Sequence, residues 1–481
     1  MFWRGVLGYL PVNIVQGVVG LLSIVIFTRI LSPQAYGVYA LAFSAMSLAQ
    51  TGLFVWLEAS MARFYVREAE AGRLAGHFAT LYRCYAVLAI GFPAVAAVFI
   101  WFWPMPNALR LAVIAGLATT PIRSLVKLSQ ERRRAAGDVN GAARLDVIQT
   151  AVGFAAGAGL AWLGLGGAAP LLGSGIVAGV LLVWVLPTDL PRARGGRFEP
   201  ARARMYAAYG LPVALSLILA LVLATTDRFL IAAYLNETSV GVYHAGYSLA
   251  NRTLDVVFIW LGMAGGPAAI AALERGGHTA LRDMAREQSA FMVALTLPAA
   301  VGLALVAKPL ADIMIGPGLR EGAAQVTPWI AASAFLAGVN THYLHTAFTL
   351  ARRTERLLVA IAIPAALNLV LNIMLVPRFG LQGALWATLA SYAVGVLMSY
   401  TLGRRSLALP IPWTMLGRTV LATGAMGLAV RSLPAYGGAL ELFGKALLGL
   451  IVYAVLAWLL DICGARTHSG RLLQALRART A

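Results

Sequence analysis

The strongest constraint on this chain is a succession of long apolar segments separated by short polar ones. A helix needs roughly 20 predominantly apolar residues to cross the hydrocarbon core of a bilayer. About fourteen segments approach or exceed this length, near residues 7–30, 37–60, 82–103, 108–127, 146–163, 168–186, 208–234, 240–266, 288–307, 325–349, 357–376, 381–402, 414–431 and 442–461. The sequence therefore predicts an all-α membrane protein with about 14 transmembrane helices.

The composition excludes a soluble enzyme or binding module. Of the 481 residues, 60% are apolar and only 12% are charged, whereas an average soluble domain is about half apolar and a quarter charged. The first segment is longer than the apolar core of a signal peptide, which spans about 7–15 residues, and no small-residue cleavage site follows it. We therefore expect it to remain as a helix.

Basic residues predict the orientation of the helices, because loops on the cytoplasmic side of a membrane are enriched in Lys and Arg. With a cytoplasmic N-terminus, 29 of the 38 Lys and Arg residues fall on the inner side and seven on the outer side, while Arg228 and Arg252 lie within segments. The net charge of +19 is thus spread over all the inner loops, which argues against a nucleic-acid site. We expect both termini in the cytoplasm.

Two short motifs indicate an internal duplication. The sequence GVY at 37–39 recurs at 241–243, and GLGGA at 164–168 is matched by GLQGA at 380–384. Each copy opens a segment with the same predicted direction, so six helices recur as a parallel repeat and two extra helices follow. Transporters built from repeats place the substrate at the repeat interface, near the midplane of the bilayer.

This duplication predicts a division of the chain into five parts. They are an N-terminal six-helix bundle, a basic cytoplasmic linker, a second six-helix bundle, two extra transmembrane helices and an amphipathic basic tail on the cytoplasmic side, at residues 1–187, 188–205, 206–403, 404–465 and 466–481.

The same regions resemble a known family. TRILSP at 28–33 with YGVY at 36–39, and DRFLI at 227–231 with VGVY at 240–243, resemble hairpins of Wzx-type polysaccharide flippases. NLVLN at 368–372 with VPRFGLQGA at 376–384 resembles the eleventh and twelfth helices of those proteins. They belong to the multidrug/oligosaccharidyl-lipid/polysaccharide exporter (MOP) superfamily.

The resemblance implies a fold, a location and a cargo. The fold is a V-shaped pair of six-helix bundles with alternating access. The location is the cell inner (cytoplasmic) membrane. The implied function moves undecaprenyl-pyrophosphate-linked oligosaccharide from the inner to the outer leaflet for the synthesis of O-antigen, capsule or exopolysaccharide. Polysaccharide polymerase and glycosyltransferases would then act as partners, together with membrane lipids.

Few charged residues lie at bilayer depth, where ionisable groups are costly and usually face a cavity or a partner. The candidates for a cationic cavity that holds the pyrophosphate are Arg29, Arg228 and Arg252, because the planar guanidinium binds phosphate oxygens bidentately and stays charged. For each, a structural role is the alternative. Arg29 would reach the outer headgroups, Arg228 would pair locally or through Asp227, and Arg252 would pair with Asp255.

Three acidic residues accompany these arginines in supporting or gating roles, namely Glu58, Asp227 and Asp255. Glu58 belongs either to an inner gate or to a pair with Arg63. Cys84 and Cys463 give neither a disulfide framework nor a metal cluster. We expect no cofactor and no metal.

Three other functions compete with a polysaccharide flippase. A drug or cation antiporter of the related MATE branch needs acidic sites, whereas the deep charges here lean basic. A lipid II flippase shares the fold, but its deep basic cluster is only partly matched. A membrane polymerase or glycosyltransferase is expected to carry catalytic residues in a large outer loop, and all the predicted outer loops are short.

Overall fold

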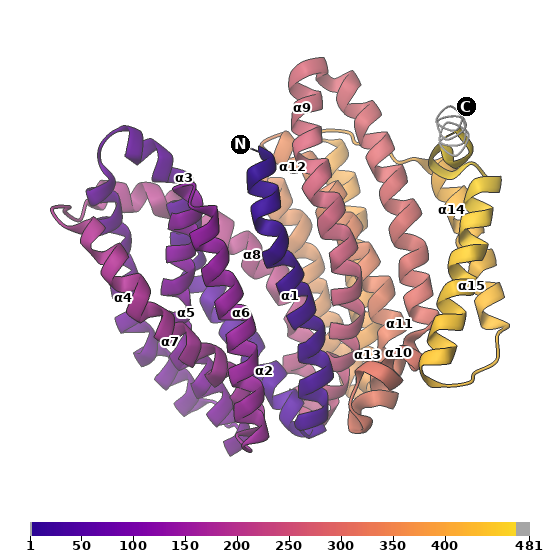
Figure 1. Ribbon diagram of the computed structural model, residues 1–481, viewed down its shortest axis with the longest axis horizontal. Helices are drawn as coiled ribbons and strands as arrows, with labels where there is room; N and C mark the ends of the chain where they lie inside the picture. The colour runs from indigo at the N-terminus through magenta and orange to yellow at the C-terminus, as the bar shows by residue number, and fades with distance from the viewer. Residues whose placement is uncertain (1, 468–481) are drawn as a thin grey trace, which may run out of the picture. The chain divides into compact units, whose positions relative to one another are not determined.

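The computed structural model describes residues 2–467, and the surroundings of side chains from Val12 onward except Ala264. This part of the chain is helical throughout and contains no strand (Figure 1). The tail predicted at 466–481 lies outside the described residues except for its first two. The α-helices are α1 (Phe2–Ile30), α2 (Pro33–Leu53), α3 (Val55–Glu70), α4 (Leu74–Phe102), α5 (Asn107–Ala135), α6 (Val139–Trp162), α7 (Ala169–Asp189), α8 (Pro200–Tyr234), α9 (Glu237–Leu305), α10 (Ala307–Met314), α11 (Pro317–Val339), α12 (Thr346–Leu350), α13 (Thr354–Arg404), α14 (Trp413–Arg431) and α15 (Gly438–Leu459).

All fourteen predicted segments fall on helices, which confirms the predicted fold class. Ten helices in the described range are long and apolar enough to cross a membrane, or 11 when α2 and α3, which meet at a 44° bend, count as one span. The count is lower than fourteen partly because α9 and α13 each contain two predicted segments. Gly277 and Gly380 interrupt these two helices with φ values of 64° and 58°, a left-handed conformation that glycine adopts without a steric penalty.

Local sequence explains where several helices begin. Ser32 caps α2 by accepting a hydrogen bond from the Ala35 amide, and Pro33 follows in the first turn. A side-chain oxygen at this position satisfies an amide that has no partner within the helix, and proline fits there because its missing N–H is not needed. Proline also opens α8 and α11.

The chain forms two compact units, Met1–His244 and Ala245–Ala481, which we call unit 1 and unit 2. The boundary falls inside α9, after its first two turns. In unit 1, α5 packs against α2, α3, α6 and α7, while α8 packs against α2 and α3. In unit 2, α11 packs on α13, α14 pairs with α15, and α10 contacts both α11 and α15. The five-part division predicted from the repeat stays a prediction.

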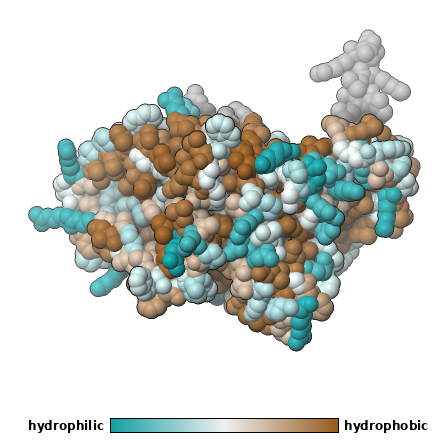
Figure 2. All heavy atoms as spheres, turned by 90° about the horizontal axis from the view of Figure 1, so that it is seen from below, coloured by the Kyte–Doolittle hydropathy of each residue, from teal (hydrophilic) through white to brown (hydrophobic). Residues whose placement is uncertain are grey.

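Large apolar side chains face outward on many helices, as a lipid environment requires. Trp101 is 84% exposed, Ile90 79%, Leu428 75% and Phe443 72%. Figure 2 shows broad apolar areas on the visible face, with hydrophilic side chains scattered between them. A soluble protein rarely exposes apolar patches of this extent. The chain is a multi-pass membrane protein.

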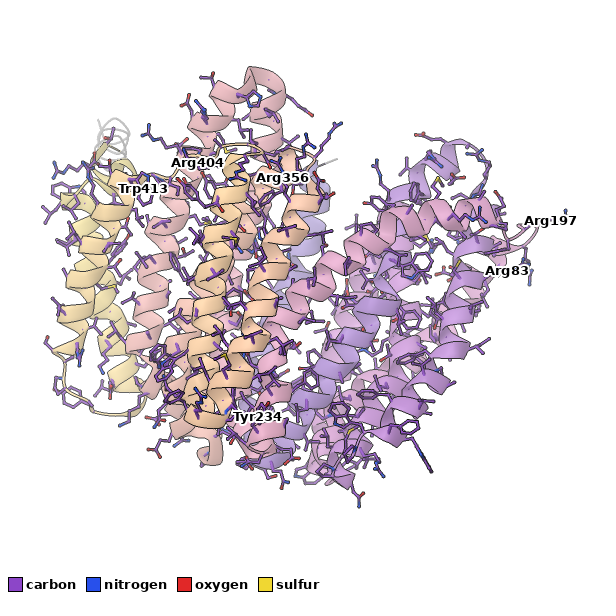
Figure 3. All side chains as sticks on the ribbon, turned by 180° about the vertical axis from the view of Figure 1, so that it is seen from behind. Arg83, Arg197, Tyr234, Arg356, Arg404 and Trp413 are labelled. Atoms are coloured by element: carbon purple, nitrogen blue, oxygen red, sulfur yellow. The ribbon has the colours of Figure 1, made fainter. Side chains whose placement is uncertain are left out.

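The basic residues gather at one end of each unit. In unit 2, Arg356 donates hydrogen bonds to the Arg405 carbonyl at 2.7 Å and to Ser406 Oγ at 2.9 Å, and Arg404 lies at the same end (Figure 3). In unit 1, α3, α5 and α7 finish at the end where α4, α6 and α8 begin, and Arg197 lies there, opposite Tyr234 (Figure 3). We call these the basic ends; that they face the cytoplasm stays a prediction.

Candidate functional site

Two of the three predicted cavity arginines lie in unit 1, in different surroundings. Arg29, at the end of α1, is exposed, and its Nη1 donates to the Val25 carbonyl one turn earlier at 2.8 Å. Arg228, on α8, is only 5% exposed, and its Nη1 donates to the Ala224 carbonyl at 3.0 Å. Both residues also have an interaction besides these hydrogen bonds. Arg29 is therefore the more accessible of the two.

Asp227 has a structural contact that the sequence did not reveal. Its carboxylate is fully buried, and Oδ2 accepts a hydrogen bond of 2.5 Å from the hydroxyl of Tyr243. Tyr243 is the tyrosine of the second GVY motif and is itself buried. The bond joins the C-terminal part of α8 to the first turns of α9 and so fixes the connection between them.

Arg252 and Asp255 lie together on α9 in unit 2, but they form no direct ion pair in the described part of the chain. Asn251 Nδ2 donates to Asp255 Oδ2 at 2.6 Å, and Arg252 acts on the carboxylate only through a longer electrostatic interaction. The Arg252 side chain is exposed, in a stretch of α9 that also carries Asn251, Thr253 and Asp255. No carboxylate of the described chain forms an ion pair with its guanidinium.

Glu58 lies on α3, one turn beyond the bend at Phe54. It forms no ion pair among the described residues, with Arg63 or with any other cation, and its Oε1 is buried without a hydrogen-bond partner. The groups that act on it electrostatically are Lys127, Glu131 and Arg134 of α5. Glu58 thus faces the charged end of α5 and not its own helix.

Sequence reasoning missed the acidic residues that neutralise the basic end of unit 1. Glu68 is 1% exposed and lies 3.0 Å from Arg67, 3.3 Å from Arg73 and 3.2 Å from Arg202, so one carboxylate binds cations from α3, the start of α4 and α8. Arg202 also reaches Glu199 at 3.1 Å.

Two further buried carboxylates, those of Asp189 and Asp146, form ion pairs with the cations near the end of α5. Asp189 Oδ1 lies 3.0 Å from Arg132 Nε, Asp189 Oδ2 lies 3.7 Å from Arg133 Nη1, and Ser129 donates to Oδ2 at 2.5 Å. Asp146 of α6 pairs with Arg134 and, at 3.1 Å, with Lys127 Nζ. Asp189 lies within the predicted basic linker, where an acidic residue is the sequence signal for such a partner, whereas Asp146 opens a predicted apolar segment.

Arg123 was counted among the basic residues of the inner side, but it lies within α5, ahead of the basic cluster in the last turn of that helix. It lies on α5 beside α2, where its Nη1 is 3.5 Å from Met46 Sδ and Tyr39 is close enough to interact electrostatically. No described acidic residue forms an ion pair with it. The middle of unit 1 thus contains a cation that no carboxylate neutralises within the described structure.

The two GVY motifs meet directly. A Cβ atom on Gly37 would lie 1.7 Å from the Glu237 carbonyl oxygen, and one on Gly241 would lie 2.3 Å from the Pro33 carbonyl oxygen. Only glycine permits helices to approach this closely. Tyr36 and Tyr39 pack around His244 beside this contact, with ring centroids 5.4 and 6.2 Å apart from it.

Metal chemistry has no evident site. In residues 2–467 no group of three or more His, Cys, Asp or Glu side chains is arranged to hold a metal ion, and Cys84 and Cys463 are free thiols.

Comparison with solved structures shows the fold. Lipid II flippase MurJ in an inward closed conformation aligns with a TM-score of 0.71 at 13% identity, over 94% of this chain and 98% of that one. An inward-facing MATE multidrug resistance transporter of the MOP superfamily aligns with a TM-score of 0.65 at 14% identity, over 82% and 94%. A MOP superfamily transporter from Pyrococcus furiosus, described as having a binding pocket of reverse polarity, aligns with a TM-score of 0.55 at 14% identity, over 84% of this chain and 93% of that one.

Comparison of sequences identifies the family. A search of curated proteins gives no match. The profile of a family described as polysaccharide biosynthesis protein, in contrast, matches residues 26–321, well over half of the chain. This range includes both GVY motifs and every predicted site residue. The chain therefore belongs to this polysaccharide biosynthesis protein family.

Proposed function

We propose that this protein is a flippase that moves undecaprenyl-pyrophosphate-linked oligosaccharide from the inner to the outer leaflet of the cytoplasmic membrane. Arg29, Arg228 and Arg252 bind the pyrophosphate, while Glu58, Asp227 and Asp255 support or gate the path. The observation that carries this proposal is Arg252, an exposed arginine in a membrane helix with no direct ion pair in the described chain. Family membership supplies the link to polysaccharide synthesis.

The physical task of such a protein is to shield a charged, sugar-bearing head group from hydrocarbon. Burial of an isolated charge in an apolar medium is strongly unfavourable, and arginines that bind phosphate oxygens offset much of this cost. One charge that crosses 100 mV gains about 2.3 kcal/mol. A pyrophosphate of roughly two negative charges therefore gains on the order of 5 kcal/mol on leaving a cell whose interior is negative.

The proposal extends to the protein's partners and location. The flippase acts in the cell inner membrane with its termini in the cytoplasm. Glycosyltransferases build the lipid-linked oligosaccharide on the inner side, and a polysaccharide polymerase consumes it outside. Consumption outside drives net transport in one direction.

Replacement of Arg252 tests this function. We expect Arg252→Ala to abolish appearance of the lipid-linked oligosaccharide in the opposite leaflet of proteoliposomes, because the deep cation that binds the pyrophosphate is gone. Arg252→Lys should retain part of the activity. The matched control is Arg353→Ala, which removes a 59% exposed arginine at the basic end of unit 2 and should leave transport unchanged.

Three outcomes would contradict the proposal. Full activity of a folded Arg252→Ala protein would remove this residue from the cargo site. Export of cationic drugs, without movement of the oligosaccharide lipid, would support a MATE-like antiporter. Movement of lipid II in preference to other lipid-linked saccharides would support a lipid II flippase.

A further inference from the structure

Arg123 differs from the other cations on the second half of α5. Lys127, Arg132, Arg133 and Arg134 each form an ion pair with an acidic side chain. Arg123 lies one turn before Lys127 and pairs with no acidic residue in the described part of the chain. The same helix therefore neutralises its cations at the basic end and leaves one without a countercharge in its middle.

The partner that the structure does give Arg123 is a poor one. Its Nη1 is 3.5 Å from the thioether sulfur of Met46, and a thioether is only a weak hydrogen-bond acceptor. The guanidinium has five N–H donors and stays charged at any relevant pH. Most of its hydrogen-bonding capacity is therefore not used by Met46.

The surroundings of Arg123 are apolar but reachable. The side chain is only partly buried, so that a ligand can approach it. On the facing helix α2, Tyr39 and Phe43 pack with ring centroids 5.9 Å apart, and Phe43 is 36% exposed. Apolar walls lower the local dielectric constant, so an arginine here attracts an anion more strongly than one in water.

These observations point to a missing negative charge. An unneutralised cation inside a membrane segment is costly, and such residues usually mark a pathway or a binding site. We propose that Arg123, assisted by the hydroxyl group of Tyr39, binds phosphate oxygens of the lipid-linked cargo within unit 1. This inference rests on the proposed function and adds a phosphate-binding residue on α5 to the arginines assigned above.

Binding to two lipids that differ only in the phosphates tests the inference. The full-length protein in nanodiscs of neutral lipid is titrated with undecaprenyl pyrophosphate and with undecaprenol. We expect Arg123→Ala to weaken binding of the pyrophosphate lipid at least tenfold, about 1.4 kcal/mol, and to leave binding of the alcohol unchanged. Arg123→Lys should restore part of the affinity, and Tyr39→Phe should weaken it a few-fold.

Two controls separate a binding role from other effects. Arg110→Ala removes an exposed cation from the opposite end of α5 and should change neither affinity, which excludes a general effect of net charge. Arg123→Met fills the same volume without charge. Its thermal unfolding temperature should equal that of the native protein or exceed it, because no ion pair is lost.

The possible results distinguish this inference from the proposed function. Equal affinity of native and Arg123→Ala protein for the pyrophosphate lipid would overturn the inference alone, provided that Arg252→Ala weakens binding. Equal loss for both lipids would assign Arg123 a packing role and also overturn it. If the native protein does not prefer the pyrophosphate lipid at all, the proposed function itself is wrong.

Discussion

The two parts of α5 handle positive charge in opposite ways. At the basic end, Asp146 and Asp189 are each almost fully buried and bind two cations apiece. In the middle, Arg123 forms a weak hydrogen bond to the thioether sulfur of Met46. The difference teaches that cations on one helix can be treated differently. The cations at the basic end are held by buried carboxylates from other helices, whereas Arg123 has no such carboxylate in the described structure.

Removal of the Asp189 carboxylate should have the largest effect on stability. Arg132 is only 6% exposed on its side chain and would be left as a buried charge without its partner, which typically costs about 3–5 kcal/mol. We expect Asp189→Ala to lower the yield of folded protein sharply, as measured by size-exclusion chromatography and thermal unfolding in detergent. An unchanged unfolding temperature would show that the ion pairs of Asp189 do not stabilise the basic end of α5.

Asp146→Ala should have a smaller effect. Its partners Lys127 and Arg134 are 38% and 34% exposed, so that both cations turn to solvent when the carboxylate is lost. The expected loss is about 1.5 kcal/mol, the lower limit for hydrogen bonds to charged groups, visible as a modest drop in the thermal unfolding temperature. Lys127→Ala serves as the matched control, because Arg134 still pairs with Asp146. If the unfolding temperature falls as far as in Asp189→Ala, the exposure of the paired cations does not determine how much stability is lost with the carboxylate.

Arg73→Ala should change stability least. Arg73 is 57% exposed, and Glu68 keeps both Arg67 and Arg202 when Arg73 is removed. An exposed ion pair contributes about 0–1 kcal/mol. Arg202→Ala, which removes an 8% exposed partner of the same carboxylate, should be clearly worse in the same unfolding measurement. Equal unfolding temperatures of the two variants would contradict the expectation that loss of a buried cation costs more than loss of an exposed one.

The fold was predictable because its signals are local and repeated. Apolar length located all fourteen segments, and the GVY copies pointed to the duplication. Counting charges also assigned most basic residues to one predicted side of the membrane. It does not distinguish a cation that forms an ion pair from one that does not. It therefore grouped Arg123 with Arg132 and Arg133, although one lies beside Met46 and the others bind Asp189.

The missing information concerns contacts between residues far apart in the sequence. Asp189 lies more than fifty residues from the arginines that it binds, and Arg202 lies even farther from Glu68. For Glu58, in contrast, a pair between neighbours in the sequence was considered, and the structure does not form it. Its neighbour Arg63 is close in sequence, yet Glu58 faces Lys127 and Arg134 of another helix. Spacing along one helix predicts such pairs only where both side chains share a face.

The contact between Gly37 and Gly241 limits how far the two GVY motifs can change. Each glycine excludes any larger side chain at its own position, since a Cβ atom there would meet backbone at or beside the other motif. The two motifs thus contact each other through matching glycines, as in a two-fold symmetric interface, where one patch contacts its own copy. Other positions of the two segments can vary, but at this point neither motif accepts even a methyl group.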